Sequence, residues 1–447
     1  MTARPVRAGR RDAYAVAAAV LLVVVAVLAG RPIQDRLRVN WPPLLATWEP
    51  HVGPGTPAAV VLAVAVVAHG PVLAARLRWP ALLAAVWATA TAWIFSLALV
   101  DGWQRGVAGR LTTRNEYLRA VGRFDDIPAA LAGFTRHILL HSPDNWPAHV
   151  AGHPPGSTLT FVLLDRAGLG GGGWAAAWCV VTGATAGVAV LVAVRALTGE
   201  SLARRAAPFL VLAPAAVWQG VSADAYFAAV AAWAVACLAL AVTGGPTRRS
   251  LPYAALSGLL FGLTCYLSYG LTLYALIGAA VVVLGRRGAR ERPVPRAALF
   301  LAGLAVVPTA FTVAGFDWWE AYRLLVTRYY EGAGGVRPYG YWVWANLACT
   351  ALITGPATAA GLSRSGTALR HPAPGADRRL AVLVAAALAA LLVADLSGMS
   401  KAETERIWLP FALWLLPCCA FLPRPRPWLT AQAALALLLN HTLLTGW

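Results

Sequence analysis

Charged residues are scarce in this 447-residue chain, in which Asp, Glu, Lys and Arg together make up only 13%. A soluble globular protein carries about 25% charged residues, because its surface must be solvated. Lysine is almost absent: Lys401 is the only one, and the remaining basic residues counted with it are arginines. Internal repeats, low-complexity tracts and long linkers are also missing. These absences argue against a soluble enzyme, a repeat protein or a string of soluble domains.

Hydrophobic residues dominate instead, at 59% of the chain and a mean hydropathy of +0.63. Apolar runs of roughly 20 residues, the length that crosses a bilayer core, recur from end to end. The sequence therefore predicts an all-α fold, a polytopic bundle of about thirteen transmembrane helices in a single transmembrane domain over residues 1–447. The expected spans are 12–30, 57–75, 80–100, 174–196, 205–220, 224–243, 252–268, 270–285, 297–315, 342–362, 379–396, 407–422 and 428–445.

The first apolar run follows a basic start and could be read as a signal peptide. We interpret it as an uncleaved helix, because the run is long and no small-x-small cleavage site closes it. The six cysteines lie in or beside apolar segments, at spacings that fit no metal site, and are expected to be packing residues.

The net charge of +18 is distributed unevenly over the predicted loops. If the N-terminus lies in the cytoplasm, the cytoplasmic segments hold 22 of the 37 basic residues but only four of the 19 acidic ones, which leaves 15 of each on the outer side. This bias follows the positive-inside rule. It predicts a multi-pass cell-membrane protein and removes the need for a nucleic-acid partner. The cytoplasmic segments lie within 1–12, 76–78, 195–205, 248–249, 286–296, 364–379 and 424–426.

Ionisable residues are almost absent from the expected spans and gather in outer loops. Residues 101–173 form the largest of these loops, and 315–341 and 395–406 form two others. We expect juxtamembrane or re-entrant helices in 101–173, because the apolar segment 153–169 is short and contains two prolines and two charges. A transporter usually places ionisable residues near the middle of its helices. The pattern therefore favours a site at the outer membrane–water interface.

The first outer loop offers two carboxylates, Asp101 and Glu116, and either could act as general base toward a hydroxyl group. Arg114 could hold a phosphate. Tyr117 directly follows Glu116, and the segment 113–121 that contains these residues has the pattern of an amphipathic surface helix. The alternative is that these charges are solvated and only balance one another.

Histidines form a second group of candidates in the same loop. His149 and His153 could hydrogen-bond a sugar or a phosphate, although a histidine that caps a turn needs no such role. The pairs His137–His141 and His149–His153 have the i, i+4 spacing of helical zinc ligands. No His-Glu-x-x-His pattern surrounds them, and prolines interrupt the second pair. We predict no metal site; the sequence identifies no cofactor and leaves the use of a divalent cation open.

The remaining candidates lie in later outer segments. Asp224 begins a span, where it could line a site or act as part of a helix N-cap region, and Tyr269 lies in a short outer turn. In the second loop, Arg337 stands among tyrosines that suit either sugar stacking or an interfacial aromatic belt. In the third loop, Lys401, Glu405 and Arg406 could contact a lipid phosphate or form a surface salt-bridge cluster.

Taken in order, these motifs resemble the GT-C class of membrane glycosyltransferases, which use polyprenyl-phosphate sugars at the outer face and include protein O-mannosyltransferases and lipid A aminoarabinose transferases. Asn115-Glu116-Tyr117 is similar to the Asp-Glu and tyrosine of their first outer loop, with Asn115 in place of the aspartate. His153-Pro154-Pro155 resembles the His-Pro-Pro of the same loop.

Two further motifs continue the resemblance. Ser222-Ala223-Asp224 is similar to the outer-face aspartate at a later helix start. The segment from Lys401 to Pro410 resembles the Lys-Glu-x-Arg-Phe and proline pattern of the dolichol-phosphate-mannose-dependent branch, with Ile407 where an aromatic residue is usual. The expected spans 57–75 and 80–100 depart from the class, in which the carboxylate loop follows the first span.

The resemblance implies an inverting-type transfer of a mannose-like pentose or hexose from a polyprenyl-phosphate sugar to a glycan, lipid or protein acceptor at the outer face of the membrane. Asp101 or Glu116 would be the base. The lipid phosphate would be bound by Arg114, His153, Lys401 and Arg406, and Asp224 with the aromatics of the second loop would shape the sugar pocket. We expect Asp101, Glu116, His153 and Arg406 to share one cavity. The alternatives are a lipid or solute transporter without covalent chemistry and a non-catalytic assembly subunit.

Overall fold

A computed structural model describes residues 3–244, 250–286, 290, 293–370 and 375–446 of the chain. Nearly all of its regular structure is helical, which confirms the predicted all-α class. Some charges of the predicted cytoplasmic loops lie outside the described residues; they are Arg248, Arg249, Arg287, Glu291 and Arg292.

Within the described residues, seven helices or helix pairs are long and apolar enough to cross a membrane, and three shorter apolar helical segments accompany them. The chain is therefore a multi-pass membrane protein, and thirteen remains the predicted number of spans. The long helices are α1 (Ala3–Gly30), α3 (Thr56–Arg76), α4 (Trp79–Ala98), the pair α8 (Gly172–Gly183) and α9 (Thr185–Thr198), α12 (Ala223–Thr243), α16 (Pro293–Val313) and α21 (Ala376–Leu396).

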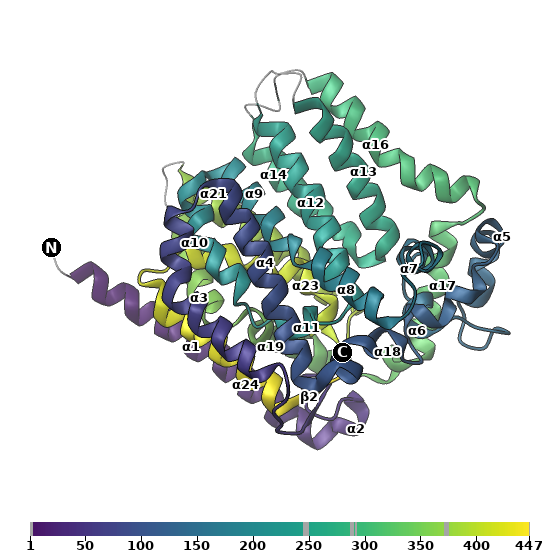
Figure 1. Cartoon of the computed structure of the whole chain (residues 1–447), viewed down its shortest axis with the longest axis horizontal. Helices are drawn as coiled ribbons and strands as arrows, with labels where there is room; N and C mark the ends of the chain where they lie inside the picture. Colours follow the sequence, from purple (N-terminus) through teal and green to yellow (C-terminus); the bar gives the residue numbers. More distant parts are fainter. Residues whose placement is uncertain (1–2, 245–249, 287–289, 291–292, 371–374, 447) are drawn as a thin grey trace.

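Other helices complete the bundle and pack between or beside the long ones (Figure 1). They are α10 (Glu200–Val211), α13 (Leu251–Leu267), α14 (Tyr274–Leu284), α19 (Tyr339–Thr354), α20 (Pro356–Arg370) and α24 (Pro425–Thr442). The segment expected as one span at 342–362 consists of two of them, α19 and α20, which meet at Gly355, whose φ of +78° suits glycine.

Two expected spans, 205–220 and 407–422, are broken rather than continuous. The first ends as α10 at Val211 and resumes only as the short α11 (Ala216–Gln219), and the second consists of α22 (Thr404–Ile407), α23 (Leu409–Ala412) and the 3-10 helix η9 (Leu416–Phe421). Prolines within both segments remove backbone donors. Non-helical backbone survives at membrane depth only when protein surrounds it.

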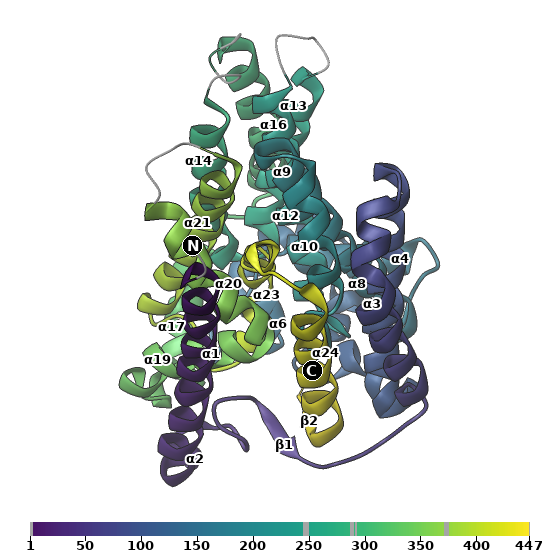
Figure 2. The ribbon, with the colours of Figure 1, turned by 90° about the vertical axis from the view of Figure 1, so that its left-hand side faces the viewer.

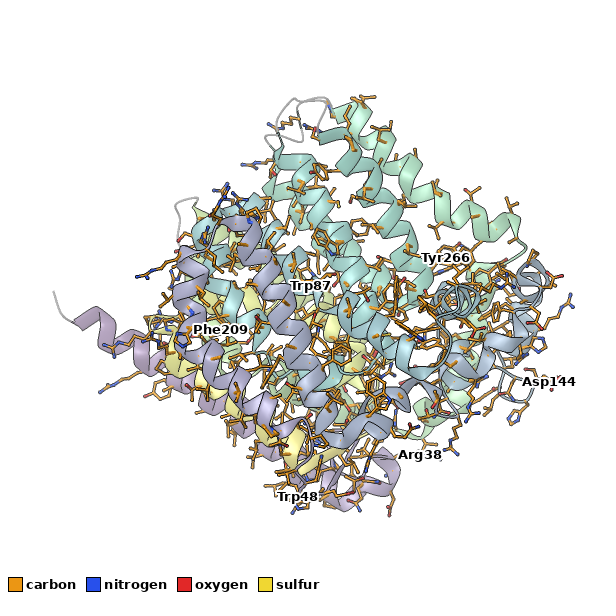
Figure 3. All side chains as sticks on the ribbon, viewed as in Figure 1. Arg38, Trp48, Trp87, Asp144, Phe209 and Tyr266 are labelled. Atoms are coloured by element: carbon orange, nitrogen blue, oxygen red, sulfur yellow. The ribbon has the colours of Figure 1, made fainter. Side chains whose placement is uncertain are left out.

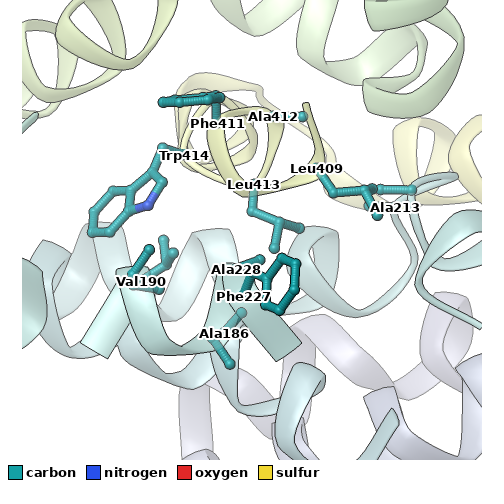
Figure 4. Packing of buried hydrophobic residues seen from close by; sticks show 14 of the residues in the cluster. Ala186, Val190, Ala213, Phe227, Ala228, Leu409, Phe411, Ala412, Leu413 and Trp414 are labelled. Atoms are coloured by element: carbon teal, nitrogen blue, oxygen red, sulfur yellow. The ribbon is translucent and has the colours of Figure 1, made fainter. Parts of the chain in front are cut away.

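Burial satisfies that requirement, because every residue in 206–229 and in 408–420 is buried. Figure 4 shows the packing: Leu413 points toward Phe227 and Ala228 of α12, and Trp414 lies toward Val190 of α9. The two broken segments therefore form the centre of the bundle, and Arg406 and Asp224 approach each other there.

At one end of the bundle, contacts join segments that the sequence assigns to the same side of the membrane. Nη1 of Arg204 donates to the carbonyl oxygens of Ala74 (2.7 Å) and Leu77 (2.8 Å). Arg364 forms an ion pair of 2.6 Å with Asp12. In each contact both partners come from segments that the sequence assigns to the same side.

At the opposite end, here called the site end, contacts likewise join segments that are distant in the sequence. The amide of Leu45 donates to Oε1 of Glu405 at 2.9 Å, and Nε of Arg337 donates to the carbonyl oxygen of Leu37 at 3.1 Å. Arg110 donates to the carbonyl oxygen of Thr445 at 3.0 Å. Residues from the start, the middle and the end of the chain thus meet at one end of the bundle.

The site end is built from short elements (Figure 2). Two strands, β1 (Ala46–Trp48) and β2 (Leu443–Thr445), pair antiparallel, with Trp48 opposite Leu443, where the sequence predicted helix for 428–445. The short helices there are α2 (Gln34–Leu37), α5 (Ile127–Ala132), α6 (Ala148–Ala151), α7 (Gly156–Arg166), α17 (Trp318–Glu331) and α18 (Ala333–Val336).

The loop 101–173 contains α5, α6 and α7 together with several 3-10 turns. Helix α7 covers the segment that was expected to be re-entrant. Its 11 residues extend over roughly 16 Å at 1.5 Å per residue, about half of a bilayer core. The expected surface helix at 113–121 is instead the 3-10 helix η5 (Tyr117–Arg123), because Thr113 to Glu116 form turns.

Candidate active site

Glu116 and His149 form the first contact of a buried cluster at the site end. Glu116 immediately precedes η5, and His149 lies in α6. The amide of His149 donates to the carbonyl oxygen of Asn115 at 2.9 Å, which fixes α6 against the start of η5. Nδ1 of His149 lies 2.9 Å from Oε1 of Glu116, and both residues are buried. The backbone contact and the side-chain contact together define the direction of the carboxylate.

Arg406 joins this pair to the centre of the bundle. Its guanidinium forms an ion pair with Asp224 in the first turn of α12, and Nη2 lies 3.4 Å from Nε2 of His149. A second carboxylate, that of Glu403, lies 3.6 Å from Nη2. The His149 ring therefore lies between Glu116 and Arg406, with one nitrogen toward each.

Tyr117 and His153 extend the cluster along the same loop. The hydroxyl of Tyr117 lies 3.1 Å from Nδ1 of His153, and this nitrogen lies 2.7 Å from the carbonyl oxygen of His149. Since a carbonyl only accepts, Nδ1 carries the proton of the neutral ring and Nε2 is the acceptor. The Tyr117 ring stacks on Phe161 of α7, with centroids 5.5 Å apart.

Burial controls the ionisation of these groups in different ways. Burial lowers the pKa of His153 to about 4, so this imidazole is neutral at pH 7. Burial alone would raise the pKa of Glu116, but His149 lowers it by its charge and hydrogen bond, and Arg406 lowers it further. The resulting pKa is below the ordinary value, so Glu116 is a carboxylate at neutral pH.

A second layer of charged residues holds the loop that carries Arg406. Arg337 donates to the carbonyl oxygen of Lys401 at 2.7 Å and to Glu403 at 3.2 Å, in addition to Leu37. Nζ of Lys401 donates to the carbonyl oxygen of Gly334 at 2.7 Å and lies 5.2 Å from the Tyr330 ring centroid. Arg337 and Lys401, two of the predicted substrate-binding cations, are thus engaged by protein groups.

Glu405 is fully buried and binds backbone. Its Oε1 accepts the Leu45 amide, whereas Oε2 has no hydrogen-bond partner among the described residues. Burial raises the pKa of Glu405 to about 7. Glu405 directly precedes Arg406, so its hydrogen bond with Leu45 ties the chain around Leu45 to the Arg406 backbone. Glu405 is therefore a positioning residue for Arg406.

Asp101 does not join the cluster, contrary to the expectation of one shared cavity for four residues. It forms ion pairs with His51 (2.8 Å) and Arg110 (2.6 Å) instead. The physical reason is the turn at Gly102, whose φ of +77° redirects the chain after α4. This leaves Asp101 beside the connection between α1 and α3.

Two other predicted residues lie apart from Glu116. Arg114 is exposed to solvent. Tyr269 is buried, with its ring 5.0 Å from Trp318 and 5.5 Å from Tyr322, and its hydroxyl has no partner among the described residues. Of the predicted residues, those brought together in the cluster are Glu116, Tyr117, His149, His153, Asp224 and Arg406.

Sequence reasoning did not include two of the charged partners. Glu403 connects Arg337 and Arg406, and its i, i+3 spacing from Arg406 was the signal that could have found it. His51 pairs with Asp101, and no local pattern indicates that contact. In the part of the chain that the structure describes, no group of three or more His, Cys, Asp or Glu side chains is arranged to hold a metal ion.

The cluster is closed in this structure. Glu116, Asp224 and Arg406 are each no more than 5% exposed. Three hollows of the structure are lined by other residues.

No protein-family model and no curated protein matches the chain. Among solved structures, the apo oligosaccharyltransferase of Archaeoglobus fulgidus is 13% identical over 75% of this chain and 50% of that one, with a TM-score of 0.49. ArnT from Cupriavidus metallidurans is 18% identical in the apo state, over 72% of this chain and 56% of that one, with a TM-score of 0.45. Its structure bound to undecaprenyl phosphate gives 15% identity, 69% and 61% coverage and a TM-score of 0.43.

The chain resembles these solved structures in fold. It spans about half the length of the oligosaccharyltransferase and 56% of apo ArnT.

Proposed function

We propose that the chain is a membrane glycosyltransferase. It transfers a sugar, a mannose-like pentose or hexose, from a polyprenyl-phosphate donor to a glycan, lipid or protein acceptor on the extracytoplasmic face. The observation that supports this most directly is the chain of contacts from Glu116 through His149 to Arg406. A carboxylate base and a phosphate-binding cation are the two groups that this transfer needs, and here they contact the same imidazole.

The site end is proposed to be extracytoplasmic and the N-terminus cytoplasmic. The opposite end carries the arginine-rich segments of the positive-inside pattern, among them those of Arg204 and Arg364. A donor with a polyprenyl tail would then lie in the outer leaflet, with its phosphate and sugar at the depth of the cluster.

In the proposed reaction, a hydroxyl oxygen of the acceptor attacks the anomeric carbon on the face opposite the phosphate. The bond from that carbon to the phosphate oxygen breaks, its electron pair stays on the oxygen, and polyprenyl phosphate leaves. The hydroxyl proton passes to the carboxylate of Glu116. Arg406 stabilises the negative charge on the leaving phosphate, and the anomeric configuration inverts.

The other cluster residues would prepare these two groups. His149 orients the Glu116 carboxylate, and Asp224 and Glu403 hold the Arg406 guanidinium. Asp101 takes no part in this scheme, because it pairs with His51 and Arg110 outside the cluster.

The test is incubation of the purified protein, in proteoliposomes, with a set of polyprenyl-phosphate sugars, followed by measurement of released polyprenyl phosphate. We expect Glu116→Gln to lower the rate by about 10²-fold or more, the usual contribution of a general base. Asp101→Asn and the exposed control Glu320→Gln should keep most of the activity.

Three results would contradict the proposal. The first is no detectable release of polyprenyl phosphate with any donor, and the second is full activity of Glu116→Gln. The third is movement of the lipid-linked sugar across the proteoliposome membrane without any transfer, which is the result expected for a transporter.

A further inference from the structure

A separate hollow of about 410 Å³ lies at the site end, between the last turns of α1 and the segment that leads into β1. Cavities of roughly 300–1,000 Å³ are typical of small-molecule sites. Figure 3 places Trp48 at the same end of the molecule as Arg38. None of the cluster residues described above lines this hollow. Its main lining residues are Val27, Arg31, Gln34, Asn40, Trp41 and Trp48, and it is called the 27–48 pocket below.

The pocket combines aromatic faces with polar groups that can still bind a ligand. Trp48 is 57% exposed and Trp41 is partly exposed. Arg31 and Gln34 are exposed, and their side chains have no hydrogen-bond or ion-pair partner among the described residues. The Asn40 amide makes only a long contact of 3.4 Å with Thr47.

This lining matches the chemistry of a carbohydrate. A sugar ring presents C–H groups on its faces, which pack on indole rings, and hydroxyl groups at its edge, which bind carboxamides and guanidinium groups. A phosphate group would favour several cations, whereas Arg31 is the one cation in the lining. A purely apolar ligand would leave the guanidinium and both carboxamides unpaired.

The pocket wall is fixed to the loop that carries Arg406. Between Trp41 and Trp48, the Leu45 amide donates to Glu405, the neighbour of Arg406, at 2.9 Å. Sγ of Cys349 donates to the carbonyl oxygen of Pro43 at 3.3 Å, and β2 holds Trp48 by strand pairing. A ligand in the pocket is therefore held in a defined position relative to Arg406.

We infer that the 27–48 pocket binds a carbohydrate unit of the acceptor, at a subsite separate from the reacting hydroxyl. The inference rests on the proposed function. The donor sugar must lie against Glu116 and Arg406, and neither residue lines the pocket. A sugar bound there therefore belongs to the second substrate, which makes the acceptor a glycan of more than one unit. Binding energy from such a remote unit positions the reacting end.

Binding is measured first, without any reaction. The full-length protein in detergent is titrated against fluorescently labelled oligosaccharides of mannose, glucose, galactose and arabinose, and fluorescence anisotropy gives Kd. At least one oligosaccharide should bind, and Trp48→Ala should weaken its binding by about tenfold or more, equivalent to about 1.4 kcal/mol. Trp48→Phe keeps an aromatic face and should bind within a few-fold of the wild type.

Trp103→Ala is the matched control, because Trp103 is 58% exposed and lies in the short π-helical turn η3 (Trp103–Ala108) after α4. Neither truncation opens a cavity in the core. If both tryptophans only anchor the protein at the membrane interface, the two alanine variants will bind alike. Equal weakening, or the absence of binding by every oligosaccharide, would overturn the inference.

Transfer to the bound oligosaccharide is measured second. Trp48→Ala should raise KM for the acceptor and leave kcat and the donor KM unchanged. An unchanged acceptor KM in an active enzyme overturns the acceptor subsite and leaves the proposed function intact. Binding that depends on Trp48, without transfer of sugar from any donor, overturns the proposed function and the acceptor role together.

Discussion

His149 contacts Glu116 through Nδ1 at 2.9 Å and approaches Arg406 through Nε2 at 3.4 Å. One imidazole thus connects a carboxylate from the loop 101–173 to a guanidinium close to the centre of the bundle. The arrangement makes the ionisation of Glu116 depend on His149, and this dependence can be measured.

The first prediction concerns the pH dependence of transfer. The charge and hydrogen bond of His149 help to lower the pKa of Glu116. Activity should require the carboxylate and be lost as pH falls through that pKa. In His149→Gln the pKa of Glu116 rises, so the acid limb of the kcat/KM profile should move to higher pH. His141→Gln, which alters an exposed histidine of the same loop, should leave the profile unchanged. Superimposed profiles of His149→Gln and wild type would refute this role.

The second prediction concerns the buried ion pair of Arg406 and Asp224, whose side chains are each 4% exposed. Arg406→Gln leaves Asp224 buried without its main partner and should cost about 3–5 kcal/mol. Adding Asp224→Asn removes that unpaired charge, so the double variant should lose less than the sum of the single losses. Equilibrium unfolding in detergent measures the three values.

Arg195 and Glu200 provide the comparison, since their side chains are 43% and 36% exposed. Arg195→Gln should have a far smaller effect on stability, because surface ion pairs contribute little. If the free-energy losses of Arg406→Gln and Asp224→Asn add up to the loss of the double variant, the two residues are not energetically coupled.

The third prediction concerns stability and pH. Burial raises the pKa of Glu405 from 4.5 to about 7, so the native state binds this proton more tightly than the unfolded state. The stabilisation is complete below about pH 4.5 and decreases as pH rises toward 7. Glutamine resembles the protonated form, so Glu405→Gln should be more stable than wild type by about 3 kcal/mol at pH 8 and similar at pH 4.5. Unfolding at several pH values measures the difference.

Glu320→Gln, which changes an exposed glutamate at the same end, should show no such dependence. A stability difference between Glu405→Gln and wild type that stays constant from pH 4.5 to 8 would contradict a raised pKa.

The fourth prediction concerns the contact between α13 and α16, which lie side by side in Figure 1. Gly258 and Gly262 have the small-xxx-small spacing that lets membrane helices approach closely. A Cβ at Gly258 would collide with the carbonyl oxygen of Phe300 and would lie 2.8 Å from the nitrogen of Leu304. Gly258→Ala should therefore destabilise the protein by about 1–3 kcal/mol.

Gly366 in α20 is the control, because a Cβ there meets no atom within 4 Å. Gly366→Ala should be neutral or slightly stabilising, since alanine favours helix. Thermal unfolding of both variants in the same detergent decides the point, and equal melting temperatures would argue against close packing at Gly258.

The sequence by itself determined the properties that depend on local pattern. Apolar length predicts membrane helices because crossing a bilayer core has a fixed length requirement. The charge bias of the loops predicts which end of the bundle faces the cytoplasm. The motifs around Glu116, His149 and Arg406 could be recognised because polar groups are rare in such a chain.

Only the tertiary structure decided which of these groups meet. Asp101 and Glu116 were equal candidates in the sequence, yet Asp101 pairs with His51 whereas Glu116 reaches the His149–Arg406 contact. The breaks within two expected spans were likewise beyond the sequence, because an irregular segment is stable at membrane depth only when other helices enclose it. Contacts between distant residues depend on how helices pack and on the direction of each side chain, and neither is encoded in a local pattern.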